Sequence, residues 1–436
     1  MTGRRGVGRV CAIFLAAGIA ASPALGGEAV IPQVGFDFDR QPKTPFELFP
    51  GFSVGSELRL DSDYESNFDL DDSVSDQLGT IQPRGEIHLL YEPFDWAQVF
   101  GRFQIASEFA LSEDAEGNNS GTAVDLEELY LLLPDIWEGV SVQVGRQDTE
   151  DPREWLFDQE FDALRVYWRE NSFGAQAFVG GISAFPRRLN EGDRDDDTVN
   201  YFLGGYYAPN EESQIGVYGF FRDDLGPDNE SPYFLGVQAE GRTDFNLGYW
   251  LEAAYVGGDD GANSVHGYGV DVGVFYIADL PMRPTITGGF AHGSGDDNLG
   301  DGEDGNFRQT GLQDNNSRFH GLTAFNIYGE LFDPELSNMD IFTAGLGIRP
   351  TKKSSFDVVY HHYRQSVAMP MLRDVGIDPD PNGASKNLGD EVDFIVGIRD
   401  IKNVRIELVG AIFFPGDAFP GADNAYLGEI EVKYKF

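Results

Sequence analysis

The chain has 436 residues, a hydrophobic content of 41% and a formal net charge of −42. This acidity argues against a nucleic-acid partner. No apolar run beyond the N-terminus reaches the roughly 18 residues of a transmembrane helix, which excludes a helical membrane protein. The 54 glycines and the aromatic content of 13% suit many short strands joined by tight turns.

Residues 1–26 are typical of a secretory signal peptide. Three arginines precede an apolar run at 10–21, and small residues follow at the expected cleavage site. Cleavage removes Cys11, the only cysteine, so we expect no disulfide, no cysteine metal site and no cofactor. We interpret residues 27–50, which contain four prolines and little alternation, as a periplasmic N-terminal segment.

Beyond residue 50 the chain repeatedly alternates apolar and polar residues, which is the period of a β-strand with two different faces. We predict eighteen strands, at 51–60, 81–91, 96–110, 123–133, 139–147, 161–169, 173–182, 199–208, 214–222, 233–241, 244–256, 265–277, 284–292, 339–349, 355–364, 389–399, 404–414 and 425–436.

The connections between these strands alternate between short turns and longer, mostly acidic stretches. Counting 318–330 as a strand would give an odd number of strands, with long connections on both sides. Treating 293–338 as one large extracellular loop restores an even number and leaves both termini in the periplasm. The sequence therefore predicts an all-β fold, a transmembrane antiparallel β-barrel over 51–436 with short periplasmic turns and long extracellular loops.

The last strand, Ala425–Phe436, has one apolar, aromatic-ended face and one charged face. In an outer-membrane barrel the apolar face meets lipid and lipopolysaccharide, and the charged face meets a water-filled lumen. We expect a Gram-negative outer membrane, and we expect Phe436 to be the end that the barrel-assembly machinery recognises.

Eighteen strands enclose a channel, so the charged faces should line it. Guanidinium groups match carboxylates, and several together could pass a carboxylated polymer by many weak contacts. The alternative is that these charges only pair with one another. The arginines expected in the lumen are Arg84, Arg102, Arg165, Arg169, Arg349, Arg364, Arg399 and Arg405. Arg146 and Glu128 do not fit the alternation of their strands.

The stretch from Gly145 to Trp168 combines aromatic and charged residues in an extracellular loop. Trp155 and Phe157 could stack on sugar rings, and the alternative role for Trp168 is an interfacial girdle residue. Over roughly 80–436, this stretch included, the chain resembles the alginate export porins of Gram-negative bacteria. The shared segments are Gly145-Arg146-Gln147, Arg153-Glu154, Asp162, Leu164-Arg165, Gly293-Ser294-Gly295, Asn306–Leu312, Gly329-Glu330, Glu335–Asn338, Val359–His361, Leu388–Asp393 and Phe414–Phe419.

This resemblance implies an eighteen-stranded barrel that exports an anionic exopolysaccharide through an arginine-lined constriction. It implies constriction roles for Arg146, Arg153 and Arg165, with Asp162 as an acidic partner, and it makes periplasmic polysaccharide-synthesis proteins candidate partners. Two connections depart from the family, because 400–403 and 111–122 are short here. That difference predicts a pore with less gating.

Two other functions remain open. A general or small-solute porin could use the same barrel for uptake. An outer-membrane hydrolase is suggested by Ser355, Asp357, His361 and His362, but adjacent histidines on a strand face opposite ways, so we expect no enzyme. The sequence also leaves open the polymer, the direction of transport, the gating, the oligomeric state and Ca²⁺ binding by the acidic blocks.

Overall fold

The computed structural model describes residues 44–111, 122–182, 187–189, 198–210, 212–226, 230–261, 263–298 and 300–436. The chain divides into Met1–Ile31 and Pro32–Phe436, and all described residues belong to the second unit. The predicted signal peptide and most of 27–50 lie outside the described residues. None of the described residues form a helix long and apolar enough to cross a membrane.

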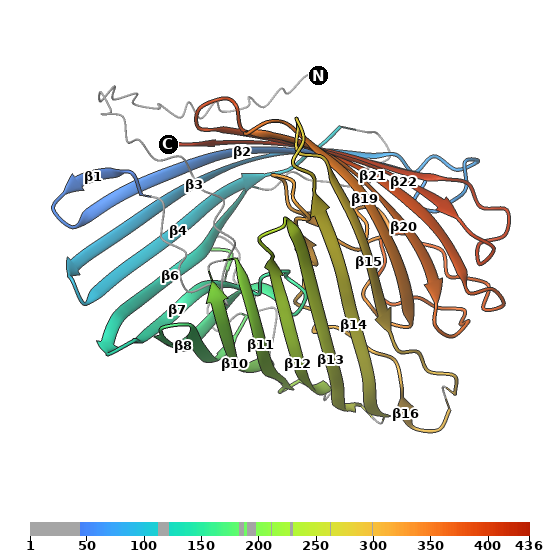
Figure 1. Ribbon diagram of the computed structural model, residues 1–436, viewed down its shortest axis with the longest axis horizontal. Helices are drawn as coiled ribbons and strands as arrows, with labels where there is room; N and C mark the ends of the chain where they lie inside the picture. The colour runs from blue at the N-terminus through green and yellow to red at the C-terminus, as the bar shows by residue number, and fades with distance from the viewer. Residues whose placement is uncertain are drawn as a thin grey trace, which may run out of the picture. The chain divides into compact units, whose positions relative to one another are not determined.

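The described part of the chain folds into one closed antiparallel barrel of eighteen strands, which confirms the predicted number (Figure 1). The barrel strands are β2 (Phe52–Ser66), β3 (Leu78–Phe94), β4 (Ala97–Ser107), β6 (Thr122–Trp137), β7 (Val140–Glu150), β8 (Asp158–Glu170), β9 (Phe173–Gly181), β10 (Thr198–Asn210), β11 (Ser213–Asp224), β12 (Glu230–Arg242), β13 (Leu247–Asp260), β14 (Asn263–Ile277), β15 (Thr285–Gly293), β19 (Met339–Thr351), β20 (Ser354–Gln365), β21 (Asn387–Ile398), β22 (Val404–Pro415) and β23 (Ala425–Lys435). Each strand pairs with the next, and β2 pairs with β23 to close the barrel.

The described residues also form five short strands, three in the barrel sheet and two in a separate sheet. β1 (Phe46–Phe49) pairs with the start of β2, within the segment that the sequence left without regular structure. β5 (Phe109–Ala110) continues the β4 edge along β3. β16 (Glu303–Asp304) runs parallel to β14. β17 (Asn316–Ser317) and β18 (Phe325–Asn326) pair with each other.

The two faces of the wall alternate as predicted. On β23, Ile430 and Tyr434 are 51% and 42% exposed on the outer face, whereas Glu429 and Glu431 face inward beside Asp63 and Asp61 of β2. This alternation keeps the outer face apolar, because a charge facing hydrocarbon is strongly disfavoured.

A β-bulge explains why Glu128 does not fit the alternation. Arg102 pairs with Glu128 and the next residue, Phe103, pairs with Leu126, so Glu127 is an extra residue in β6. The shift turns the Glu128 side chain inward, where its carboxylate lies 3.1 Å from Arg102.

Arg146 lies where β7 separates from β6. The register between the two strands runs from Trp137–Val140 to Leu129–Arg146 and then ends. Gly145 has a φ of +123°, and a Cβ there would lie 2.2 Å from the carbonyl oxygen of Leu129, so only glycine fits. Beyond this point residues 187–189 pair with β6 instead, through backbone hydrogen bonds at Val124 and Leu126.

The segment 294–338 is one long connection on the extracellular side, as predicted for 293–338, but its path inside the barrel was not predicted. It leaves and re-enters the wall at the extracellular ends of β15 and β19, but it folds down into the barrel, so we name it the luminal loop. Phe307, Phe332 and Leu336 are fully buried. The segment folds inward because its apolar side chains would be unfavourably exposed to water outside, whereas the interior of a wide barrel can bury them.

Placing a charge on the outer face should destabilise the barrel. Ile430→Arg puts a guanidinium near the middle of β23 on the lipid side, and we expect a loss of about 2–4 kcal/mol in the free energy of unfolding from phospholipid vesicles. Glu429→Arg is the matched control, since it places the same group inside, beside Asp63. Equal losses for both variants would contradict the assigned faces.

Candidate functional site: the lumen

The luminal loop reaches from the extracellular rim to the periplasmic end of the barrel. Arg349 of β19 donates hydrogen bonds to the carbonyl oxygens of His320 and Gly321. Arg399 donates to the carbonyl of Leu322 at 2.5 Å, and the Leu322 amide donates to Ser355 Oγ at 2.9 Å. Because Arg349, Arg399 and Ser355 lie at periplasmic strand ends, the loop fills one side of the lumen through its full depth. Burial, together with Arg349 and other arginines, lowers the pKa of His320 to about 3.

A carboxylate on β21 holds the middle of the luminal loop. Glu391 is fully buried and accepts hydrogen bonds from the amides of Leu331 and Phe332 at 2.8 and 2.9 Å. Tyr363 donates its hydroxyl to the carbonyl of Tyr328 at 2.7 Å. Gly329 packs against this tyrosine so closely that a Cβ would lie 2.0 Å from its hydroxyl oxygen. These contacts fix the loop against the β20–β21 wall.

The shared segment Asn306–Leu312 forms the core of this packing. The Gln309 side chain donates to the carbonyl of Trp155 at 2.7 Å and accepts from the amide of Leu336 at 3.1 Å. Arg308 is buried and donates to Asp260 at 2.8 Å. These residues fix the luminal loop and do not face the open lumen.

The loop between β7 and β8 (residues 151–157) folds under the luminal loop. The Asp151 carboxylate accepts amide hydrogen bonds from Leu156 and Phe157 at 2.7 and 2.9 Å. Trp155 and Phe157 are 1% and 0% exposed, and the Trp155 indole donates to the hydroxyl of Tyr328 at 2.6 Å. The hypothesis that these two rings stack on a sugar is therefore wrong, because both are buried in protein.

The three arginines implied by the resemblance are also buried. Arg146 forms a two-pronged pair with Asp162 at 2.8 Å. Arg153 donates to Asp271 at 2.9 Å, and Arg165 donates to Gln176 at 2.6 Å. Their exposed fractions are 3%, 4% and 1%. The prediction that they line an open passage is corrected, since the ion pairs of Arg146 and Arg153 and the hydrogen bonds of Arg165 are buried and hold the wall and its inner loop together.

Arg364 faces outward, which corrects its predicted position in the lumen. On β20 the fully buried Tyr363 and His361 point inward, so Arg364 takes the opposite parity. Its guanidinium lies 3.5 Å from Asp340 of β19. Near the extracellular rim the outer face leaves the hydrocarbon, and charged groups are tolerated there. His361 contacts Thr343 at 3.0 Å and Asp393 at 3.4 Å, and the adjacent His362 faces outward beside Asp390.

Four cations from adjacent strands lie side by side on the inner face of β22, β23, β2 and β3. Arg405 of β22 pairs in register with Lys433 of β23, Lys433 with Arg59 of β2, and Arg59 with Arg84 of β3. We call these four residues the basic row. Like charges directly across strands repel, so this row requires compensation from its neighbours.

Three carboxylates, which we call the acidic row, provide that compensation. They lie two residues along each strand from the basic row, on the extracellular side of it. Glu407, Glu431 and Asp61 occupy the next inward positions of β22, β23 and β2. Arg59 contacts both Asp61 and Glu431 at 2.7 Å. The Arg59 side chain is 32% exposed and the Asp61 side chain 8% exposed, so the cations are presented to the lumen in front of their partners.

The luminal loop adds one more cation to this region. Arg318 is exposed and has no ion pair or hydrogen bond within the part of the chain that the structure describes. Loss of hydration inside the barrel lowers the pKa of Arg318. Attraction to Glu407 raises this pKa and repulsion from Arg405 lowers it, so the three charges interact. Sequence reasoning missed Arg318 because it lies in a segment interpreted as extracellular. The signal that could have found it is the apolar run that follows it at 319–332.

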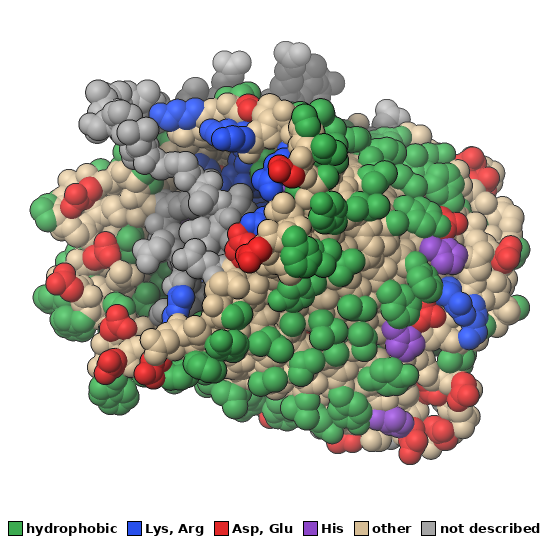
Figure 2. All heavy atoms as spheres, in the orientation of Figure 1, with side chains coloured by type: hydrophobic (Ala, Val, Ile, Leu, Met, Phe, Trp, Pro, Cys, Tyr) green, Lys and Arg blue, Asp and Glu red, His purple; other side chains and the backbone are tan. Residues whose placement is uncertain are grey.

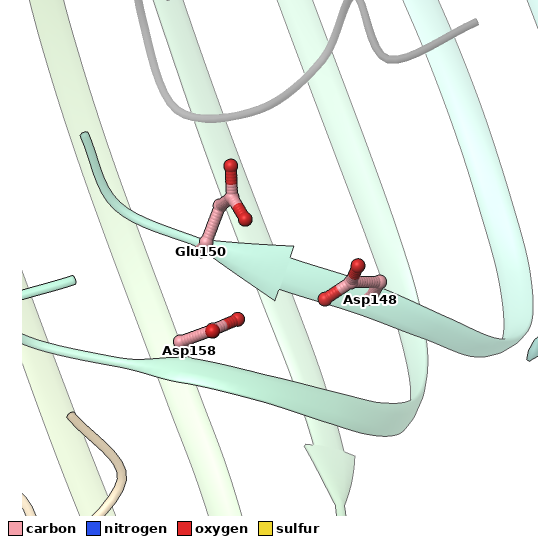
Figure 3. Close-up of side chains that lie close together, drawn as sticks. All are labelled: Asp148, Glu150 and Asp158. Atoms are coloured by element: carbon pink, nitrogen blue, oxygen red, sulfur yellow. The ribbon is translucent and has the colours of Figure 1, made fainter. Parts of the chain in front are cut away.

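Arg102 stands apart from the basic row within an acidic surrounding. It lies 3.1 Å from Glu128 and 3.4 Å from Glu160. Above it, on the extracellular side, the carboxylates of Asp148 and Glu150 on β7 approach Asp158 of β8, with oxygens within 4.8 Å of one another (Figure 3).

The 151–157 loop extends this acidic corner. Burial, together with repulsion from Glu150 and Asp314, raises the pKa of Glu154 to about 8. The carboxyl groups of Glu154, Asp158 and Asp314 have oxygens within 4.8 Å of one another, so acidic residues are gathered at the extracellular end of the lumen.

The outer surface differs from the interior. Figure 2 shows hydrophobic side chains spread over the outer face of β11–β15, and Lys and Arg side chains gathered around the hollow end beside the C-terminus. An apolar outside and a charged inside are what an outer-membrane channel requires.

Comparison with known proteins identifies the family. The chain matches the family described as "Alginate export" over residues 51–433. The chain belongs to the alginate export family. Similar members are the "Alginate production protein AlgE" of Pseudomonas aeruginosa, at 26% identity over 76% of this chain and 81% of that protein, and that of Azotobacter vinelandii, at 29% identity over 37% and 39%.

Solved outer-membrane proteins of Pseudomonas aeruginosa share the fold. OpdK aligns with a TM-score of 0.58 and 14% identity, and OccK2 (OpdF), solved in complex with glucuronate, aligns with a TM-score of 0.57 and 14% identity. Each alignment covers 88% of this chain and 98% of the other. At this identity the likeness shows the fold alone. Together with the family, it places this barrel in the Gram-negative outer membrane.

Removing the Glu391 carboxylate should loosen the luminal loop. A hydrogen bond to a charged acceptor contributes about 1.5–3 kcal/mol, so Glu391→Ala should lower hydrogen-exchange protection of the Leu331 and Phe332 amides by roughly 10- to 100-fold. Single-channel conductance should also become larger or noisier. Asp390→Ala, on the outer face of the same strand, is the control. Unchanged protection in Glu391→Ala would show that the loop is held by other contacts.

Proposed function

We propose that the barrel is a passive, non-catalytic channel that exports an anionic, alginate-like exopolysaccharide. The passage runs between the luminal loop and the wall formed by β22, β23, β2 and β3. The observation that carries this proposal is the basic row, four partly exposed cations in register across one wall, in a chain of the alginate export family.

The chemistry of the row suits a uronate polymer. Arginine offers paired donors that match a carboxylate, and lysine offers a mobile point charge. Transport requires each contact to be weak enough to release. The acidic row meets this requirement, because Asp61 and Glu431 already hold the cations and compete with a passing carboxylate.

We further propose that Arg84, Arg405 and Arg318 take part in these contacts, with Arg102 nearer to the acidic corner. Uptake of small solutes through the same passage is the alternative function. The structural likeness to porins fits it only through the fold, and the family supports export.

Three partner assignments belong to the same proposal. Phe436 forms backbone hydrogen bonds of 2.9 and 3.0 Å with Ser56, and its terminal position suits recognition by the barrel-assembly machinery. The outer face suits outer-membrane lipid and lipopolysaccharide. Periplasmic polysaccharide-synthesis proteins would deliver the polymer.

Neutralising the basic row tests the proposal. The variant Arg59→Gln/Arg405→Gln/Lys433→Gln should shift the reversal potential in a KCl gradient toward cation selectivity. It should also weaken block of the current by an oligo-uronate about tenfold or more, because the attraction for carboxylates is lost. Polymer secretion by a host that depends on this channel should fall in parallel.

The matched control for this experiment is Arg364→Gln/Lys402→Gln, which removes cations from the outer face and a periplasmic turn. It should leave both the selectivity and the block unchanged. Equal effects of the two sets, or wild-type block after loss of the row, would contradict the proposed function.

A further inference from the structure

The luminal charges of the open wall are ordered by depth. At the periplasmic end of this wall Lys435 pairs with Glu57. The basic row occupies the next inward-facing positions toward the exterior. The acidic row comes next. The following pair is Glu429 with Asp63, and Glu65 lies beyond it. The cations of this wall therefore stand nearer the periplasm than most of its carboxylates.

No cation follows the basic row toward the exterior among the described inward-facing residues of β22, β23, β2 and β3. Their outermost inward positions are carboxylates, small residues or apolar residues. The Thr80 hydroxyl donates a hydrogen bond to the carboxylate of Asp63 at 3.1 Å, so the contact partner of this carboxylate is neutral.

The luminal loop and the 151–157 loop show the same order, with a cation near the basic row and carboxylates toward the exterior. Arg318 interacts with Arg405 and Glu407 near the basic row. Toward the exterior, Arg308 and Arg373 pair with Asp304 and Glu335. The carboxylates of Glu154, Asp314 and Asp333 have no ion pair among the described residues. Asp314 donates its amide to the carbonyl of Glu154, which brings these two acids together. Burial raises the pKa of Asp333 to about 6, and repulsion from Asp374 and Asp314 contributes to this shift.

From this arrangement we propose that the passage captures anionic polymers preferentially at its periplasmic mouth and resists their entry from outside. The inference rests on the proposed function and adds a direction to it. A polyanion arriving from the periplasm meets cations first and is attracted. A polyanion arriving from the exterior meets Asp63, Glu65 and Glu429 first and is repelled.

The asymmetry is kinetic. A passive pore leaves the equilibrium distribution of the polymer to its electrochemical gradient. Fixed charges at a mouth change how often a charged chain enters, by 10-fold to about 1,000-fold, and the effect weakens with salt. An exporter with this order of charges would thread outgoing chains readily and exclude released polymer from re-entry.

Side-specific block in planar bilayers tests this inference. With channels inserted in one orientation, a defined oligo-uronate is added to one compartment and then to the other, at equal driving voltage. We expect blocking events about tenfold more frequent from the periplasmic side in 0.1 M KCl, and a ratio approaching one in 1 M KCl.

A double substitution tests whether Asp63 and Glu429 form the electrostatic barrier to entry from the exterior. Asp63→Asn/Glu429→Gln should raise the frequency of block from the extracellular side several-fold and leave the periplasmic frequency near wild type. Asp390→Asn, which neutralises an acid on the outer face, should change neither.

The outcomes separate the two proposals. Equal capture from both sides in the wild type would overturn the directional inference and leave the export channel standing. Absence of block from either side would overturn the proposed function and this inference with it.

Discussion

The space inside an eighteen-stranded wall is the constraint on which the structure depends. Such a barrel encloses more volume than its own side chains can fill. Here the luminal loop fills one side over the full height, held by Glu391 at its middle and by Arg349 and Arg399 at its tip. The passage that we propose runs beside the loop, along the wall formed by β22, β23, β2 and β3. In that proposal the loop determines which charges a solute can meet.

That displacement divides the charged residues into two groups. Arg146 and Arg153 are buried in ion pairs, and Arg165 is buried in hydrogen bonds to Gln176 and Thr149. These contacts give the wall and its inner loops a single arrangement. The basic row remains partly exposed, and the acidic row beside it offsets the repulsion among its four cations. Residues shared with the family at 306–312 belong to the first group. A shared arginine in this chain therefore does not by itself indicate a contact with the solute.

Alternation predicted all eighteen strands because a lipid-facing wall imposes a strict period of two. It failed where the wall departs from that period, at the Glu127 bulge, and where charge alone was used to assign a face, as for Arg364. The luminal loop could not be placed from its sequence, since its position depends on contacts with strands far away in the chain. Arg318 was missed for the same reason. The basic row was only partly visible, because Arg84 and Arg405 were identified but their register with Arg59 and Lys433 appears only when the barrel closes.

The central claim is that water and solute pass along the basic row and not along the wall behind the luminal loop. Reaction of introduced cysteines with a charged thiol reagent during conductance recording measures this directly. Arg59→Cys and Lys433→Cys should react rapidly and change the current. Thr287→Cys and Asn200→Cys, which lie on inward faces that the structure buries, should react at least a hundredfold more slowly. Similar rates at all four positions would show that the loop leaves both walls open and would contradict the account.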